Sequence, residues 1–324
     1  MTGGRLGRFD AGWTRVELGL AVAVTAALVG ALVGWVLLKG LASKTTDAFF
    51  AGLVLRGLLA AVVAGAVSRR FSQRTSVTTA AALLAGASAW AWRDAGADYF
   101  GNVLGWLQDG SLLTWVGGLR GLGTRLTLWL ALLGASLATA TGRHVTVDLV
   151  TRALGDTWRG PLQRAGGVLA AAVCFASAWG FFDFSAIDAF HAPASASPTE
   201  KARLVTAGLA RHAALAWRQV SLDARMAPKV LSAQPWDRSL SAAEWNAALD
   251  SSTDATVLAL RETDAAATRA PLLSLPGEPA RGLLVKDFNL VIPFGLVLLA
   301  LRFLLWVLRG GPQEAAHGAA EAAT

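Results

Sequence analysis

The first long apolar run of the chain, residues 18–38, reads LGLAVAVTAALVGALVGWVLL and carries no charge between Glu17 and Lys39. A helix needs about 20 mostly apolar residues to cross the roughly 30 Å hydrocarbon core of a bilayer, and a helix satisfies its own backbone hydrogen bonds there. The run is longer than the apolar region of a signal peptide, and residues 40–43 make a poor cleavage site. It therefore predicts an uncleaved transmembrane helix.

The composition of the whole chain also indicates a membrane protein. Of its 324 residues, 54% are hydrophobic and 16% are charged, and the mean hydropathy is +0.47, whereas soluble domains carry about 25% charged residues. The formal net charge of +7 is typical of an excess of Lys and Arg in cytoplasmic membrane loops, so no nucleic-acid partner is expected. The single cysteine, Cys174, lies in an apolar run and excludes a disulfide framework and a cysteine metal site.

Five further apolar runs extend this interpretation to about six transmembrane helices. They cover residues 49–68, 75–92, 126–142, 165–182 and 283–308. The predicted fold class is an all-α integral membrane protein with a helical periplasmic insertion, in which residues 17–183 hold five spans and residues 283–309 the sixth. Arg56 interrupts the second run, and an intramembrane arginine is a functional candidate by default. Two interpretations stay open for it: an interface-snorkelling or structural role, or a contact with a partner subunit or a lipid headgroup.

The distribution of Lys and Arg predicts the orientation, because cytoplasmic loops carry an excess of both. With the N-terminus inside, twelve lie in inner segments: Arg5, Arg8, Arg15, Arg69, Arg70, Arg74, Arg143, Arg152, Arg159, Arg164, Arg302 and Arg309. Five lie in the short outer loops: Lys39, Lys44, Arg93, Arg120 and Arg125. We therefore expect residues 1–16 and residues 310–324 in the cytoplasm. The latter form a low-complexity tail that is predicted to be disordered.

Residues 99–122 are apolar in part but are not expected to span the membrane. They place apolar side chains at mostly helical spacing, with Trp106 and Trp115 among them, and tryptophan favours the membrane interface. We expect an outer-surface helix or a re-entrant hairpin. The alternative is a structured loop that packs on the spans.

Residues 184–282 form the second stretch that does not span, and their near-neutral mixture of charges is typical of a soluble surface. Ser197 and Glu200, like Ser241 and Glu244, have the spacing of a helix capping box. This predicts a periplasmic helical domain. Its two helices are expected at residues 198–226 and 242–268, and the loop that connects them at residues 228–236. Its role is open between a brace, a docking surface for another protein, and an unrelated task.

The sequence contains no recognisable catalytic or metal-binding motif. Its four histidines lie in four different segments, and no cluster of acids falls within the predicted spans. We therefore expect no enzyme activity, no cofactor and no bound metal. The lack of acids also argues against a proton or cation pathway built by this chain alone.

The most informative segment is the fourth span. Gly134, Ala138 and Gly142 recur every four residues and so share one helix face, where small side chains let another helix approach closely in lipid. Such spacing is also common in alanine-rich spans. Beyond it, Arg143 is a cytoplasmic anchor, while His144 and Asp148 share a face if the helix continues.

This segment resembles the small permease (DctQ-type) subunit of tripartite ATP-independent periplasmic (TRAP) transporters. The family pattern falls here on Trp129, Gly134, Ala135, His144, Val145 and Asp148. Residues 15–22 resemble the first span of the family, and residues 290–304, with Pro293 before Gly295, resemble the last. The sequence departs from the family in its extra spans near 49–92, its external insertion, and Arg125 near the place of a usual acidic residue.

The resemblance implies a non-catalytic subunit of a secondary transporter in the bacterial inner membrane. In such systems a periplasmic solute-binding protein captures an organic anion, often a carboxylate, and a large permease (DctM-type) subunit carries it inward with sodium. The small subunit braces the large one within the lipid bilayer. The candidate subunit-interface residues are Trp129, Gly134, Ala135, Ala138, Gly142, Arg143, His144, Asp148 and Arg56. The alternative is a structural or assembly membrane protein not involved in transport.

Overall fold

The computed structural model describes residues 3–44, 51–71, 75–140, 156–250, 252, 254–274 and 279–308. The chain divides into two compact units. The first unit comprises residues 1–29, 124–210 and 285–324, and the second comprises residues 30–123 and 211–284. Almost all of the described structure is helical, which confirms the predicted all-α membrane fold.

Five helices of the described residues are long and apolar enough to cross a membrane. They lie within α1 (Gly3–Ala42), α2 (Ala51–Phe71), α6 (Gly118–Ala140), α8 (Asp156–Phe190) and the pair α12 (Val285–Asn289) and α13 (Val291–Leu308). The expected third span forms α3 (Thr75–Ser88), whose 14 residues extend about 21 Å at 1.5 Å per residue. The predicted count of six spans is therefore not confirmed, because α3 alone is shorter than the hydrocarbon core.

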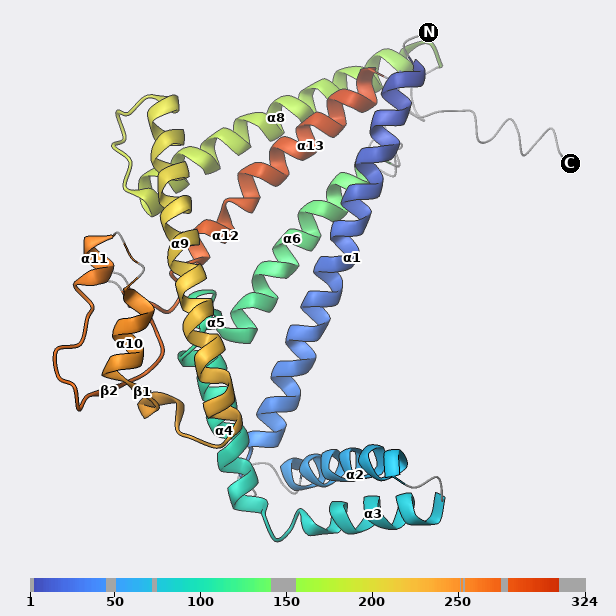
Figure 1. Cartoon of the computed structure of the whole chain (residues 1–324). Coiled ribbons are helices and arrows are strands. Elements are labelled where there is room, and N and C mark those ends of the chain that lie inside the picture. Colours follow the sequence, from blue (N-terminus) through green and yellow to red (C-terminus); the bar gives the residue numbers. More distant parts are fainter. Residues whose placement is uncertain are drawn as a thin grey trace, which may run out of the picture. The chain divides into compact units, whose positions relative to one another are not determined.

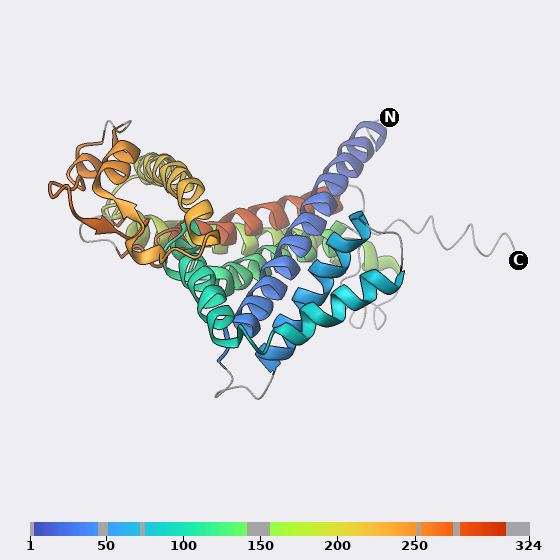
Figure 2. The same ribbon diagram turned by 60° about the horizontal axis from the view of Figure 1, so that its bottom comes forward.

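In the first unit, α8 and α13 pack along each other in opposite directions (Figures 1 and 2). Near the start of α8, Gly167 packs directly against α13, where a Cβ on the glycine would lie 2.5 Å from the Val307 side chain. At the other end the Lys286 ammonium donates to the carbonyl of Asp188 at 3.3 Å. The glycine thus permits a close crossing, which is how helices pack in lipid.

Helices α6 and α13 run in the same direction in this unit. Arg125 Nη1 near the start of α6 donates to Asn289 Oδ1 at 3.0 Å, just before α13 begins. Further along, Leu132 packs on Gly295, where a Cβ would lie 2.7 Å from the leucine Cδ1. The starts of α6 and α13 and the end of α8 therefore lie at the same end of the first unit.

The second unit contains a helical hairpin of α2 and α3 (Figures 1 and 2). The two helices meet at glycines: a Cβ on Gly57 would lie 3.1 Å from the carbonyl oxygen of Gly86. Gly65 faces the Cβ of Ala82 further along. Small residues thus let the two backbones approach closely along the hairpin.

The remaining elements of the second unit are short, apart from the long α9, which starts in the first unit. They are α4 (Arg93–Asp109), α5 (Leu112–Trp115), α9 (Pro198–Leu231), η1 (Trp236–Arg238), β1 (Leu240–Ser241), α10 (Ala242–Leu249), α11 (Ala255–Leu258) and β2 (Thr268–Arg269). The two strands pair antiparallel, with Leu240 opposite Arg269.

A compact hydrophobic core joins these elements into one domain, which we name the external domain after its predicted location. Its fully buried members include Trp115, Leu222, Met226 and Trp245. Trp236 reaches α4 only because glycines line that helix, since a Cβ on Gly105 would lie 2.8 Å from the tryptophan Nε1. The domain is therefore held by packing within this chain, as a domain without disulfides requires.

Backbone and side-chain hydrogen bonds fix residues 99–122 to this domain. The backbone N–H of Leu284 donates to the carbonyl of Trp115 at 2.9 Å, and Asn102 bonds the backbone of Gln234 and Trp236 at 2.8 and 3.1 Å. These residues were expected on the outer surface or against the spans. In the second unit they pack on the core of this domain, and their position relative to the membrane surface stays a prediction.

A buried glutamine closes the same core. Gln219 is fully buried on α9, donates to the carbonyl of Pro271 at 2.6 Å and accepts from the backbone N–H of Leu273 at 2.9 Å. It also donates to Asp223 at 2.9 Å, and the other carboxylate oxygen of Asp223 accepts from the N–H of Leu112 at 2.8 Å. Burial raises the pKa of Asp223, while these hydrogen bonds oppose the shift.

The predicted caps are present, but one predicted helix is too long. Ser241 and Glu244 form a reciprocal capping box, and Ser197 accepts from the N–H of Glu200 at 3.3 Å. The helix expected at 242–268 ends at Leu249. The next residues are polar and short, and such side chains compete with the backbone for hydrogen bonds and favour turns. The expected loop residue Pro228 instead lies inside α9.

We predict that Gln219→Ala destabilises the external domain. The change leaves the carbonyl of Pro271 and the N–H of Leu273 buried without partners, and each unpaired group costs about 1–3 kcal/mol. Thermal unfolding of the purified full chain measures the effect. Ser221→Ala, on the exposed side of the same helix, is the matched control; an equal midpoint for both variants contradicts the role of Gln219.

The capping box also predicts a dependence of stability on pH. The Lys229 ammonium, 2.7 Å away, and the Ser241 backbone N–H lower the pKa of Glu244 from 4.5 to about 2. Because the folded pKa is depressed, the contribution to stability is complete above pH 4.5 and is lost as the pH falls toward 2. Glu244→Gln should lower the melting temperature at pH 7 and leave a smaller drop between pH 7 and pH 3. Parallel pH curves for variant and parent contradict this.

Candidate functional site

Helix α6 presents two different faces in the first unit. Ser136 and Thr139 are buried, with relative exposures of 1% and 0%. Gly134 lies on the opposite, exposed face, and a Cβ added there would meet nothing within 4 Å. None of the described residues therefore covers the backbone of Gly134 in the predicted interface motif.

The structure describes only part of the predicted interface set. Trp129, Ala135 and Ala138 are half-buried on α6, and the indole Nε1 of Trp129 is buried without a hydrogen-bond partner in the described structure. The predicted candidates Gly142, Arg143, His144 and Asp148 lie outside the described residues. Their role, and the helix face that they were expected to share, stay predictions.

A buried ionic cluster of side chains from α1 and α13 packs against α6. It was not predicted from the sequence. The Arg302 guanidinium of α13 donates through Nη2 to Glu17 Oε2 at 2.6 Å and to the Thr14 hydroxyl at 3.2 Å. Its Nη1 donates to Asp10. The side chains of Arg302 and Glu17 are only 1% and 4% exposed, so the pair is removed from solvent.

Glu17 links this cluster to α6. Its second oxygen accepts hydrogen bonds from the Ser136 hydroxyl at 2.7 Å and from the Trp13 indole at 2.6 Å. The Arg302 guanidinium also lies over the Trp13 ring, 5.2 Å from its centroid, a geometry that favours a cation–π attraction. One carboxylate thus joins α1, α6 and α13.

The cluster also fixes the polarity of the spans. It joins the first half of α1 to the ends of α6 and α13, and Gly167, near the start of α8, packs on the end of α13. The start of α1, the end of α6, the start of α8 and the end of α13 therefore share one end of the first unit. These four helices of the first unit therefore alternate in direction, as membrane crossings do.

The sequence carried a signal for this cluster. Asp10, Thr14 and Glu17 recur at spacings of four and three residues and so share a helix face. Arg302 is the single charge in the apolar run of α13. Sequence reasoning placed Glu17 at the boundary of a span and Arg302 near an interface, and hydrophobic patterning does not pair such residues across helices.

Arg56 of α2 caps the C-terminal end of α1 in the second unit. Its Nη1 donates to the carbonyls of Leu41 and Ser43, at 2.5 and 3.1 Å, where α1 ends. The residue is fully buried, and its Cδ lies 2.9 Å from the position that a Cβ on Gly96 would occupy. A cation at the carbonyl end of a helix is stabilising, so these contacts favour the structural interpretation of Arg56.

These elements define an integral membrane protein of the all-α class, with long apolar helices and, in the second unit, a domain of shorter elements. Among the described residues, no group of three or more His, Cys, Asp or Glu side chains forms a candidate metal site. The buried charges of the first unit pair with one another. No catalytic set is assembled in the part of the chain that the structure describes.

A comparison with protein families finds a family that is similar to part of this chain. The family model for the DctQ component of tripartite ATP-independent periplasmic transporters matches residues 114–222. This confirms the resemblance for residues 114–222, which form a region similar to the DctQ component of these transporters. No curated protein and no solved structure matches the chain.

The matched region covers α5, α6, α8 and the first part of α9. Eight of the nine predicted interface residues lie within it, and Arg56 lies outside. The resemblances at residues 15–22 and 290–304 also lie outside the match. The polar cluster nevertheless ties both of these flanking segments to α6, through Glu17 and Arg302.

We predict that the ionic cluster stabilises the fold through coupling between its members. Arg302→Met should cost about 3–5 kcal/mol, because it leaves two carboxylates buried without their cation. Arg302→Met combined with Glu17→Met should recover part of that loss. Thermal unfolding of the purified chain in detergent measures the three variants. Losses that simply add would show that the two residues do not interact.

Proposed function

We propose that the chain is the non-catalytic small membrane subunit of a binding-protein-dependent secondary transporter of the bacterial inner membrane. It acts as the scaffold for a large permease (DctM-type) subunit, which carries an organic anion, a carboxylate, inward with sodium. The observation that carries this proposal is the uncovered Gly134 face of α6, which lies inside the DctQ-type region.

The arrangement of α6 suits a scaffold. Ser136 ties one face to α1, and Leu132 packs on Gly295 of α13 on another. On the remaining face, Gly134 is exposed, and so is Ala131, which lies one helical turn before it. Because lipid tails are as apolar as leucine, helices associate in membranes by close packing, and a bare glycine backbone on a firmly held helix provides it.

The buried charges of the first unit are consistent with a bracing role. Intramembrane ionisable groups often mark ion or substrate pathways, but here Arg302 pairs with both Asp10 and Glu17. A site for sodium or for a carboxylate needs groups that are not already paired. On this proposal both sites lie in the large subunit.

The external domain lies on the periplasmic side in this proposal. It follows α8 and precedes α13 in the sequence. The last turn of α8 and the start of α12 lie together, at the end of the first unit opposite the start of α1. With the N-terminus in the cytoplasm, that end faces the periplasm, where a solute-binding protein arrives. A brace over the large subunit and a docking surface for the binding protein both fit this position.

The first test concerns the α6 face. Gly134→Leu should weaken association with the large permease subunit by about 1–3 kcal/mol, by analogy with overpacked cores. Gly180→Leu is the matched control, because Gly180 is an exposed glycine of α8 with nothing within 4 Å of an added Cβ. Co-purification of the two subunits measures the effect.

Uptake into proteoliposomes completes this test. Sodium-driven uptake from a panel of radiolabelled carboxylates should require this chain, the large permease and the binding protein together, and should fall with Gly134→Leu but not with Gly180→Leu. Equal co-purification and equal uptake with both variants contradict the α6 interface. Uptake that is independent of this chain contradicts the transport role and favours a structural or assembly protein.

The second test concerns topology, in a Cys174→Ala background. A membrane-impermeant thiol reagent applied to intact cells should label Ser232→Cys but neither Gly7→Cys nor Ser72→Cys. The last position follows Arg69 and Arg70 in the sequence, and these residues favour the cytoplasm. Labelling of Gly7→Cys reverses the orientation. Labelling of Ser72→Cys together with Ser232→Cys means that the hairpin does not cross.

A further inference from the structure

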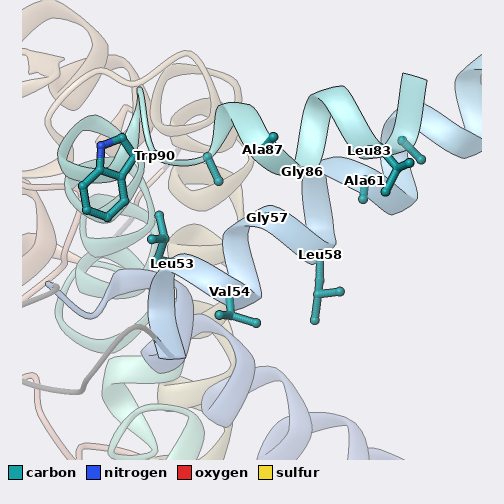
Figure 3. Close-up of a pocket in the computed structure, with 11 residues that line it drawn as sticks. Leu53, Val54, Gly57, Leu58, Ala61, Leu83, Gly86, Ala87 and Trp90 are labelled. Atoms are coloured by element: carbon teal, nitrogen blue, oxygen red, sulfur yellow. The ribbon is translucent and has the colours of Figure 1, made fainter. Parts of the chain in front are cut away.

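The α2–α3 hairpin of the second unit forms an open apolar groove of about 410 Å³. On α2 the lining runs from Leu53 to Ala61, and on α3 and the turn after it from Ala82 to Trp90 (Figure 3). Every lining side chain is apolar, apart from the indole N–H of Trp90. The stretch on α2 is about 12 Å long at 1.5 Å per residue.

The surroundings of the groove are as apolar as its lining. The large side chains on the outside of the hairpin are exposed: Val54, Leu58, Leu59, Val62, Val63, Val67, Val77, Leu83 and Leu84. Val62 is 68% exposed and Leu84 is 73% exposed. A helix pair with apolar residues on all sides is not stable against water and lies in hydrocarbon, so the groove opens toward lipid chains.

The two ends of the hairpin differ. The connection between α2 and α3 follows Arg69 and Arg70, while the open end carries Trp90 at one end of the groove (Figure 3). The Arg93 guanidinium lies over the Trp90 ring, 4.7 Å from its centroid, and its side chain is 40% exposed. Its Nε is 3.4 Å from Asp94 Oδ2, a weak pair that leaves the other guanidinium nitrogens for an anion.

A tryptophan beside an exposed arginine is typical of the level of the lipid headgroups. Arginine also binds phosphate oxygens strongly, because its planar donors match their geometry. An apolar groove that ends at such a pair therefore fits a molecule with a hydrocarbon chain and a phosphate. A phospholipid has both.

A helix of a protein partner fits this groove less well. Close helix packing needs uncovered small residues, but Gly57 and Gly86 are already in contact with each other across the hairpin. The rim of the groove consists of exposed branched side chains, such as Leu58 and Leu83. The face of α6 differs in this respect, because Gly134 there has nothing within 4 Å of an added Cβ.

We propose that the α2–α3 groove binds one acyl chain of a phospholipid, with the phosphate at the Trp90–Arg93 end. The lipid fills the space between the two helices on the lipid side of the hairpin. It is held by contact with Leu53, Gly57, Ala61 and Ala87 and by the charge of Arg93. This binding does not depend on the transport role.

Native mass spectrometry of the full chain, purified in a mild detergent, tests the groove. The parent should retain phospholipid, and Ala87→Phe, which fills the groove, should retain roughly tenfold less, corresponding to about 1.4 kcal/mol of affinity. Ala80→Phe is the matched control, because Ala80 is exposed on the same helix but does not line the groove. Arg93→Gln should also reduce retention, whereas Arg93→Lys should keep most of it.

A second measurement does not depend on a variant that alters packing. A benzophenone amino acid at position 87, activated by light in intact cells, should add the mass of a phospholipid to the chain. An adduct with a second polypeptide at this position makes the groove a protein-docking site and overturns the proposal. Equal phospholipid retention by the parent and Ala87→Phe, or no phospholipid retained by the parent, overturns it as well.

Discussion

The guanidinium of Arg302 is the group on which the first unit depends. A single arginine within a transmembrane helix costs about 2.5–3.5 kcal/mol on insertion scales, so it requires partners. Asp10 and Glu17 supply two carboxylates, and Glu17 in turn engages Ser136 of α6 and the Trp13 indole. One charge on α13 therefore determines which faces of α1 and α6 point inward, and its removal leaves acids buried without a cation.

The orientation of α6 follows from this cluster. With Ser136 directed to Glu17, Gly134 necessarily lies on the other side of the helix, because residues two apart point in nearly opposite directions. The same contacts engage all three charged side chains of the cluster, Arg302, Asp10 and Glu17. A paired interior, and a glycine face that the described residues leave uncovered, support the proposed scaffold role.

The additional parts of the chain are inserted between the four alternating helices of the first unit. The hairpin and α4–α5 precede α6, and the rest of the external domain precedes α13. Residues far apart in sequence, such as Trp115 and Leu284, are joined by backbone hydrogen bonds in the external domain. The starts of two neighbouring spans thus share one domain, which explains how a long insertion is held without disulfides.

The sequence by itself determined the membrane class, the helices and their approximate positions, because about 20 apolar residues in a row have no other stable form in lipid. It also predicted the Ser241–Glu244 capping box and the DctQ resemblance, since both depend on residues close together in the chain. Only the tertiary structure decided the pairing of Arg302 with Glu17, the cap that Arg56 makes on α1, and the packing of α4–α5 on the external domain. Each of these joins residues on different helices, and hydrophobic periodicity carries no information on which helix a charged side chain meets.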